Sequence, residues 1–356
     1  MSVLSTYKQA CKAALAAHCS FAAYFEPGNR HTHFICDDHS NSKPISDEVF
    51  FAAPWATPFS QAEIIVSRMT AEQAETLRPS ATSPFAHALK PWRKSTDPTL
   101  YCEQVTKLAE YLRFNRGKTV ISTVLCTPTA EADIVELADR VFDRLPSDTH
   151  RCLLFTPAFG AWIIASPELL LSVHKDTQSI KTIALAGTRR AGTSGDWDKK
   201  NIDEQQMVAT FVAETLSLHA KNIKIDGPHT RDAGRVEHLE TIFSATLNEP
   251  DEVPALLESL NPTPAVCGTP RKAALRIIEQ AEEHPRRLYG GYFGISDSKR
   301  IVAAVTLRCA QISDTDACIY AGGGITGASH ADDEWAETRL KGKALLELIT
   351  QPSKSL

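Results

Sequence analysis

The chain has 356 residues, of which 43% are hydrophobic and 23% charged, and its formal net charge at pH 7 is −5. These values are typical of a soluble globular protein with room for one or two domains. No basic excess points to nucleic-acid binding, and the apolar stretches are too short for a membrane span.

The N-terminal segment predicts an amphipathic helix and not a signal peptide. Its apolar residues recur at helical spacing, and Lys8 and Lys12 interrupt them. The nine cysteines are an odd number and form no CxxC pair. This usage favours reduced, mostly buried thiols over a disulfide framework. We therefore expect a cytoplasmic protein.

Residues 1–95 are less regular than the rest and are rich in His, Pro and Ser. Zinc ligands are conceivable here, but the spacing fits no standard finger and only one sulfur is present. An irregular surface segment is the simpler interpretation. The residues concerned are His31, His33, Cys36 and His39.

From residue 97 onward, the spacing of the apolar residues clearly indicates secondary structure. Asp97 before Pro98 predicts a helix start, and the helix is expected to reach Asn115. Its apolar face is predicted to consist of Val105, Leu108, Leu112 and Phe114. Further helices are expected over residues 129–145, 198–221, 251–260 and 271–283.

The expected strands are separated by turn residues and joined largely as hairpins. They cover residues 118–127, 152–156, 161–166, 169–174 and 180–187, followed by a meander of 290–296, 300–312 and 316–323. This pattern predicts an α+β fold with large, mostly antiparallel sheets.

A glycine-rich stretch, "GGGITGASHADDEWAETRLK", begins at Gly322 and opens the last predicted helix. Glu334, Glu337 and Lys341 fall on one helix face because they are three and four residues apart. The simplest interpretation is a solvated ion pair. The alternative is a ligand site, since the glycines let backbone amides approach a ligand closely. The stretch lacks the Lys-Ser/Thr pair of a phosphate-binding loop.

Three further charged residues lie where chemistry is conceivable. Glu204 falls on the apolar face of the long helix, and with Glu334 and Glu337 it would form an all-oxygen site suited to Mg²⁺. Glu168 follows a Ser-Pro turn, and in a dry pocket it would serve as a general acid. Lys118 begins a strand, and in such a pocket it would activate a water molecule. For each, an exposed or helix-terminal position is the simpler alternative.

Seven motifs together resemble the chorismate-utilising enzymes, over about residues 105–348. They are "IALAGTRR", "SPELLLS", "RVEHL", "NPTPAVCGTPRKAAL", "RLYGGYFG", "TLRCAQI" and "YAGGGITGASHADDEWAETRLK". The resemblance implies two large antiparallel sheets packed as a sandwich with helices outside. It also implies that residues 101–350 form the chorismate-binding catalytic part, and that 1–100 form a divergent part of the same domain.

The resemblance also assigns roles residue by residue. Glu204 and Glu337 match Mg²⁺ ligands, and Glu334 matches a carboxylate that acts through water. Other positions match groups around the substrate: Gly187, Thr188, His238, Ala265, Tyr289, Leu307, Arg308, Gly322 and Lys341.

Individual positions favour one subfamily, the Mg²⁺-dependent isochorismate synthases. Lys118 matches the base of the members that use water, and Glu168 matches the acid. Ala186 stands where aminodeoxychorismate synthases carry a nucleophilic lysine, and Ala265 where salicylate synthases tend to have threonine. The expected substrate is chorismate, and the expected assembly is a monomer or homodimer in menaquinone or siderophore biosynthesis.

Two departures keep other readings open. The usual "KDxxEH" is "KNIDEQ" here, with Asn201 replacing the acid and Gln205 the histidine. Asn201 would weaken Mg²⁺ binding, because it removes a negative charge. These departures suggest the alternative of a weakly active chorismate-binding subunit. A salicylate synthase, which adds pyruvate elimination, is the other alternative.

Overall fold

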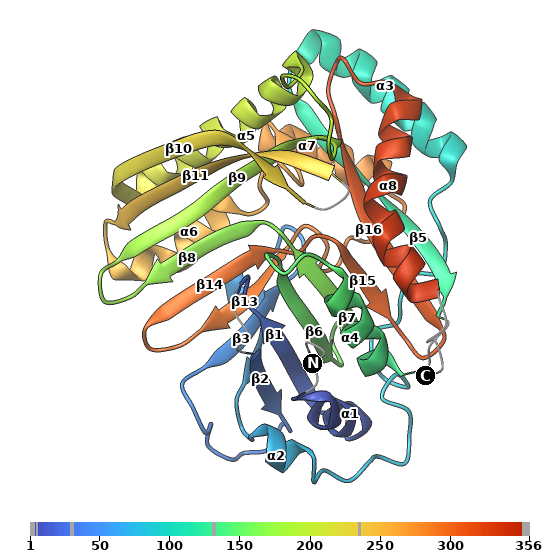
Figure 1. The fold of residues 1–356 in the computed structure, drawn as a ribbon, viewed down its shortest axis with the longest axis vertical. Coiled ribbons are helices and arrows are strands. Elements are labelled where there is room, and N and C mark those ends of the chain that lie inside the picture. The colour runs from blue at the N-terminus through green and yellow to red at the C-terminus, as the bar shows by residue number, and fades with distance from the viewer. Residues whose placement is uncertain (1–3, 5, 29–31, 130–132, 234–235, 351–356) are drawn as a thin grey trace.

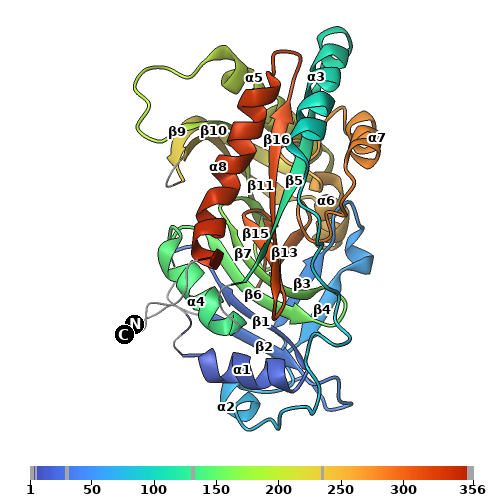
Figure 2. The same cartoon turned by 90° about the vertical axis from the view of Figure 1, so that its right-hand side faces the viewer.

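The computed structural model describes residues 4, 6–28, 32–129, 133–233 and 236–350. Within them, two eight-stranded antiparallel sheets pack face to face, and helices cover the outer faces (Figures 1 and 2). The predicted α+β class with large antiparallel sheets is confirmed. None of the described helices combines the length and hydropathy that a bilayer-crossing segment needs.

In both sheets, neighbouring strands often come from distant parts of the chain. The first sheet has the order β12 (Gly268–Thr269), β5 (Lys118–Pro128), β16 (Asp316–Ile325), β15 (Cys309–Ile312), β7 (Gly160–Ser166), β6 (His150–Thr156), β1 (Ser20–Phe25), β2 (Thr32–Asp37). The second sheet has the order β10 (Ala220–Asp232), β11 (Val236–Leu247), β9 (Ser179–Arg190), β8 (Leu169–His174), β14 (Arg300–Val305), β13 (Tyr292–Ser296), β3 (Val49–Ala53), β4 (Glu63–Val66).

Two groups of helices cover the outer faces of the sheets, and α3 (Pro98–Asn115) and α7 (Arg271–Ala281) lie at the β5 end of the first sheet (Figure 2). One outer face is covered by α1 (Lys8–Ala16), α4 (Ile134–Arg144) and α8 (Ala331–Thr350), the other by α5 (Lys199–His219) and α6 (Val253–Leu260). The remaining helices are α2 (Ala71–Ala74), η1 (Phe59–Gln61) and η2 (Pro250–Glu252).

The core forms on both sides of each sheet because successive strand residues point to opposite faces. In β6, Leu153 and Phe155 pack with the helices, whereas Cys152 and Leu154 pack toward the second sheet. Strands buried on both faces lack polar alternation, and for that reason these segments appear in the sequence as short apolar runs.

The predicted meander is wrong at one point. Residues 300–312 form two strands, since β14 pairs in the second sheet and β15 in the first. The break falls at Arg308, whose φ of 44° is incompatible with an extended strand. The chain makes the same crossing at Pro167–Glu168, between β7 and β8.

The two crossings lie side by side and are tied to each other by backbone hydrogen bonds. The Val305 amide donates to the Glu168 carbonyl over 3.0 Å, and the Ala165 amide donates to the Arg308 carbonyl over 3.2 Å. Residues of both crossings line one cavity.

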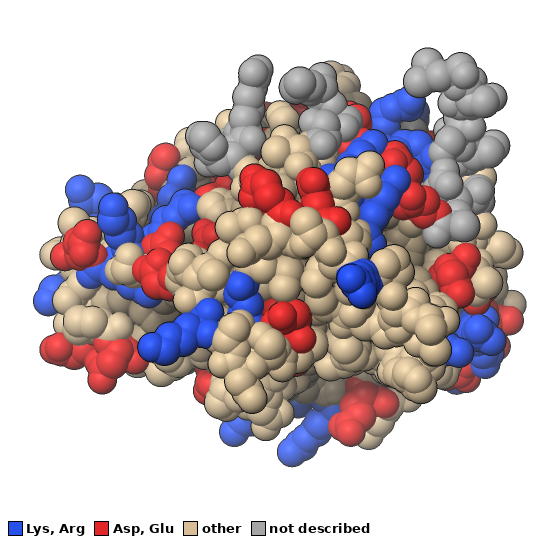
Figure 3. Space-filling model, turned by 90° about the horizontal axis from the view of Figure 1, so that it is seen from below, with Lys and Arg blue, Asp and Glu red and all other residues tan. Residues whose placement is uncertain are grey.

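The sequence did not predict every element of the fold. Strands β1–β4 and the β10–β11 hairpin were not predicted, and β10 is exposed along most of its length. In α3, Val105, Leu108 and Leu112 are buried as expected, but Phe114 is 88% exposed. At 100° per residue, Phe114 lies on the face opposite Val105. On the face seen in Figure 3, basic and acidic side chains are interspersed.

Candidate active site

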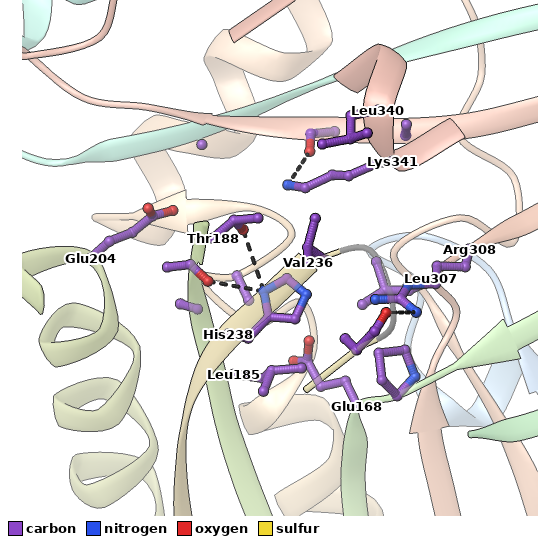
Figure 4. A pocket seen from close by; sticks show the side chains of 18 of the residues that line it. Glu168, Leu185, Thr188, Glu204, Val236, His238, Leu307, Arg308, Leu340 and Lys341 are labelled. Carbon is purple, nitrogen blue, oxygen red and sulfur yellow. Dashed lines mark hydrogen bonds between the residues drawn. The ribbon is translucent and has the colours of Figure 1, made fainter. Parts of the chain in front are cut away.

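A cavity opens where the chain crosses between the sheets (Figure 4). Of the residues that the sequence assigned to a site, all except Glu334 and Glu337 line this cavity. The lining residues are Lys118, Pro167, Glu168, Leu185, Ala186, Gly187, Thr188, Glu204, Ala233, Val236, His238, Ala265, Tyr289, Leu307, Arg308, Tyr320, Ala321, Gly322, Gly324, Leu340 and Lys341.

Glu168 is a buried carboxyl at the crossing between β7 and β8, with 2% of its surface exposed. Burial raises its pKa to about 8 and outweighs the opposing effects of Lys118 and of the Thr263 hydroxyl. That hydroxyl donates to Glu168 Oε1 over 3.4 Å. At neutral pH the Glu168 side chain is therefore mostly protonated and can donate a proton into the cavity.

Lys118 begins β5 and is also 2% exposed. The preceding Gly117 has a φ of 134°, and a Cβ there would lie 2.4 Å from the Thr269 carbonyl oxygen. Glycine at this position allows β12 to pair closely with the start of β5. The Lys118 Nζ lies 2.5 Å from Glu204 Oε1, so the amine forms an ion pair across the cavity wall.

The glycine triplet at the end of β16 makes room for side chains from other elements. A Cβ on Gly322 would lie 2.5 Å from the Tyr289 hydroxyl, and one on Gly324 would lie 2.5 Å from Glu204 Oε1 and 2.7 Å from Lys118 Cε. Neither position tolerates a side chain without displacing cavity residues. Close approach of a ligand was one explanation for these glycines, and in the structure Gly324 makes room for the Lys118–Glu204 pair.

The three carboxylates proposed as metal ligands are each held by a different lysine. Glu204 pairs with Lys118, and Glu334, only 1% exposed, pairs with Lys200 over 2.7 Å. The third pair joins Glu337 to Lys341 over 2.7 Å.

This pairing bears on the predicted metal site. The sequence predicted three carboxylates converging on one ion, but among the described residues no group of three or more His, Cys, Asp or Glu side chains is placed to hold a metal. Each of the three anions is engaged by an ammonium. Glu337 is nevertheless ionised at neutral pH, as a metal ligand must be. Its burial disfavours the ionised form, but Lys341, Lys200 and Lys118 outweigh this and lower its pKa.

His238 and the Gly187–Thr188 segment form one wall of the cavity (Figure 4). His238 Nδ1 lies 2.9 Å from the Gly187 carbonyl oxygen and 3.3 Å from the Thr188 hydroxyl. Burial lowers the His238 pKa to about 4, so the ring is neutral at pH 7. Donation from Nδ1 to the carbonyl leaves Nε2 as a hydrogen-bond acceptor.

Asn201 and Gln205, the two departures from the usual motif, have structural partners and do not line the cavity. Asn201 Oδ1 accepts from the Thr188 amide over 2.7 Å. Gln205 Nε2 donates to the Ala184 carbonyl and the Thr241 hydroxyl, both over 3.0 Å. Both amides therefore fix α5 against the second sheet.

Arg308 and Lys341 supply positive charge to the cavity. Arg308 Nη1 donates to the Ala233 carbonyl over 3.3 Å, and burial lowers its pKa. Lys341 Nζ donates to the Gly322 carbonyl over 3.0 Å. The neighbouring Tyr289 ring stacks on Tyr320, with 5.8 Å between ring centroids. A small molecule with two carboxylates would find cationic partners here.

Two residues at or near the site, Lys200 and Tyr320, were not predicted from the sequence. Lys200 is the first residue of "KNIDEQ", so the motif could be recognised in the sequence, but its contact with Glu334 could not. Of the residues considered for zinc, His31 lies outside the described part. His33 contacts Glu26 and Glu48, and His39 contacts Ser20.

Fold and cavity together define a small-molecule site with acid–base groups and a cationic lining. Consistent with this, the sequence pattern of chorismate binding enzymes matches residues 31–347. The chain belongs to the chorismate binding enzyme family.

Several curated relatives carry names of particular enzymes. Isochorismate synthase EntC of Escherichia coli K12 is 32% identical over 202 residues, covering 53% of this chain and 51% of EntC. Isochorismate synthase MenF of the same strain is 31% identical over 211 residues, covering 56% and 48%. Anthranilate synthase component 1 of Bacillus caldotenax is 30% identical over 207 residues, covering 53% and 40%. The chain thus spans about half the length of these relatives.

Solved structures show the same fold. MenF, the menaquinone-specific isochorismate synthase from Escherichia coli, superimposes with a TM-score of 0.76 at 20% identity, covering 95% of this chain and 91% of that one. The putative isochorismate synthase DhbC from Bacillus anthracis gives 0.73 at 21% identity, covering 95% and 99%.

Proposed function

We propose that the protein is an Mg²⁺-dependent isochorismate synthase, which converts chorismate reversibly to isochorismate. The observation that carries this proposal is that Glu168, a buried carboxyl with a raised pKa, and the Lys118 side chain line the same cavity. The reaction needs a base for the incoming water and an acid for the departing hydroxyl. The names of the relatives EntC and MenF support the same reaction.

The chemistry balances without any other reactant. Water attacks C2 of chorismate, the ring double bonds shift, and the C4–oxygen bond breaks. Lys118 accepts the proton of the attacking water, and Glu168 gives its proton to the departing hydroxyl, which leaves as water. Lys118 must first give up its own proton and leave its ion pair with Glu204, because only the neutral amine accepts a proton from water.

Binding and orientation fall to the remaining cavity residues. Arg308 and Lys341 provide the positive charge for the two carboxylates of chorismate. The neutral His238 ring offers its Nε2 as an acceptor for a substrate hydroxyl. Leu185, Leu307 and Val236 provide the apolar surface for the ring.

The donor set fits Mg²⁺, because Glu204, Glu334 and Glu337 offer oxygen ligands only and Glu337 has a lowered pKa. These three side chains would hold the ion. When bound, Mg²⁺ supplies positive charge that neutralises the ring carboxylate of chorismate.

Ala265 lines the cavity at the position where salicylate synthases tend to carry threonine, and this favours stopping at isochorismate over the salicylate synthase alternative. A weakly active binding subunit has less support, because Asn201 and Gln205 lie outside the lining.

A product assay tests the proposal. Purified protein is incubated with chorismate in the presence of MgCl₂ or EDTA, and the products are separated by chromatography. We expect isochorismate, formed only with Mg²⁺. Salicylate as the main product would favour the alternative, and the absence of any product would refute the assignment.

A further inference from the structure

Lys200 contacts a candidate metal ligand, yet it does not line the cavity. Its Nζ lies 2.7 Å from Glu334 Oε1, and its side chain remains 34% exposed. Glu204 and Glu337 also act electrostatically on Lys200, after burial and Glu334. One ammonium group therefore lies within the field of all three carboxylates.

The other two lysines of the site have further roles that explain their presence. Lys118 is the proposed base, and Lys341 faces the substrate space and donates to the Gly322 carbonyl. Lys200 has neither role, and its side chain is partly exposed to solvent. A buried carboxylate such as Glu334 requires a cation beside it, and Lys200 supplies that charge in the structure.

We infer that Lys200 occupies the cation position beside Glu334 while no divalent ion is bound, and that it thereby weakens Mg²⁺ binding. The inference rests on the proposed function, because it requires Mg²⁺ at Glu334. An ammonium and Mg²⁺ compete for the same carboxylate oxygen and repel each other at short range. Lys200 must therefore leave Glu334 when the ion binds, and its departure reduces the observed affinity.

The opposite role would be positioning, in which Lys200 holds Glu334 ready for the ion. The two roles differ in the sign of one measurable change. If Lys200 competes, its removal tightens Mg²⁺ binding. If it positions Glu334, its removal weakens binding.

The test is a calorimetric titration of the purified full chain with MgCl₂. Lys200→Met removes the charge, and Lys200→Gln is a second variant that keeps a polar side chain. Lys199→Met is the matched control, since Lys199 is 88% exposed, pairs with Asp203 and lies in the same helical turn. Thermal melting checks that each variant is folded.

We expect the Mg²⁺ dissociation constant to fall about tenfold in Lys200→Met and to change less than about twofold in the control. An unchanged or higher dissociation constant in both Lys200 variants, with wild type binding normally, overturns the inference alone. If wild type binds no Mg²⁺ with or without chorismate, the metal dependence of the proposed function fails, and the inference fails with it.

Discussion

The substitution Glu168→Gln tests whether the Glu168 carboxyl is protonated, through protein stability as well as catalytic activity. The Glu168 carboxyl is buried in the fold, and its pKa is raised to about 8 from an ordinary 4.5. Below pH 4.5 the carboxyl is protonated in both folded and unfolded chains, so it has no effect on stability. Between pH 4.5 and 8 the unfolded chain loses the proton first, so the free energy of unfolding of wild type falls as pH rises.

The magnitude follows from the two pKa values. At about 1.4 kcal/mol per pH unit, the full penalty above pH 8 is at most roughly 5 kcal/mol. Glutamine carries no such penalty. Glu168→Gln should therefore be more stable than wild type at pH 9, by an amount that shrinks toward pH 5. Its turnover should fall at least about 100-fold at every pH, because the general acid is gone.

Urea denaturation of both proteins at pH 5, 7 and 9 measures this difference directly. Glu283→Gln is the matched control, since Glu283 is an exposed carboxylate paired with Lys94 at the surface. It removes one carboxylate without altering the cavity. A Glu168→Gln variant that is less stable than wild type at pH 9, or a stability difference that does not vary with pH, would refute the reasoning.

Three other predictions concern single substitutions. Lys118→Met should lower turnover at least about 100-fold while Mg²⁺ still binds in calorimetry, because Glu204 loses its ammonium partner but remains as a ligand. Gly324→Ala should lower both turnover and melting temperature, since its Cβ would lie 2.5 Å from Glu204 Oε1. His33→Gln should reduce the free energy of unfolding by about 2 kcal/mol at pH 6. Burial opposes protonation of His33, but Glu26 and Glu48 raise its pKa to about 9, so the deficit should shrink as pH rises through 9.

Short-range patterns in the sequence predicted those parts of the site that lie on one element. Glu334, Glu337 and Lys341 share a helix face because of their spacing, and the structure pairs Glu337 with Lys341 as that spacing suggests. The pair of Lys200 with Glu334 joins residues 134 positions apart, on two different helices. No local pattern reports such a contact, because it depends on how α5 and α8 pack.

The same limit applies to the fold. The apolar run at 300–312 gave no sign that the chain turns at Arg308, since a positive φ at a non-glycine residue leaves no trace in hydropathy. Strand β10 was missed for the opposite reason. Its side chains are mostly exposed, so hydrogen bonding to β11 defines the strand without an apolar pattern.

The central claim is that Lys118 and Glu168 direct water to C2 of chorismate while the C4 hydroxyl departs. Incubation with chorismate and Mg²⁺ in ¹⁸O-labelled water, followed by mass spectrometry, tests this most directly. The account predicts isochorismate carrying one ¹⁸O atom in its C2 hydroxyl. Unlabelled isochorismate would mean that the hydroxyl migrates within the molecule, and it would contradict the assigned roles of both residues.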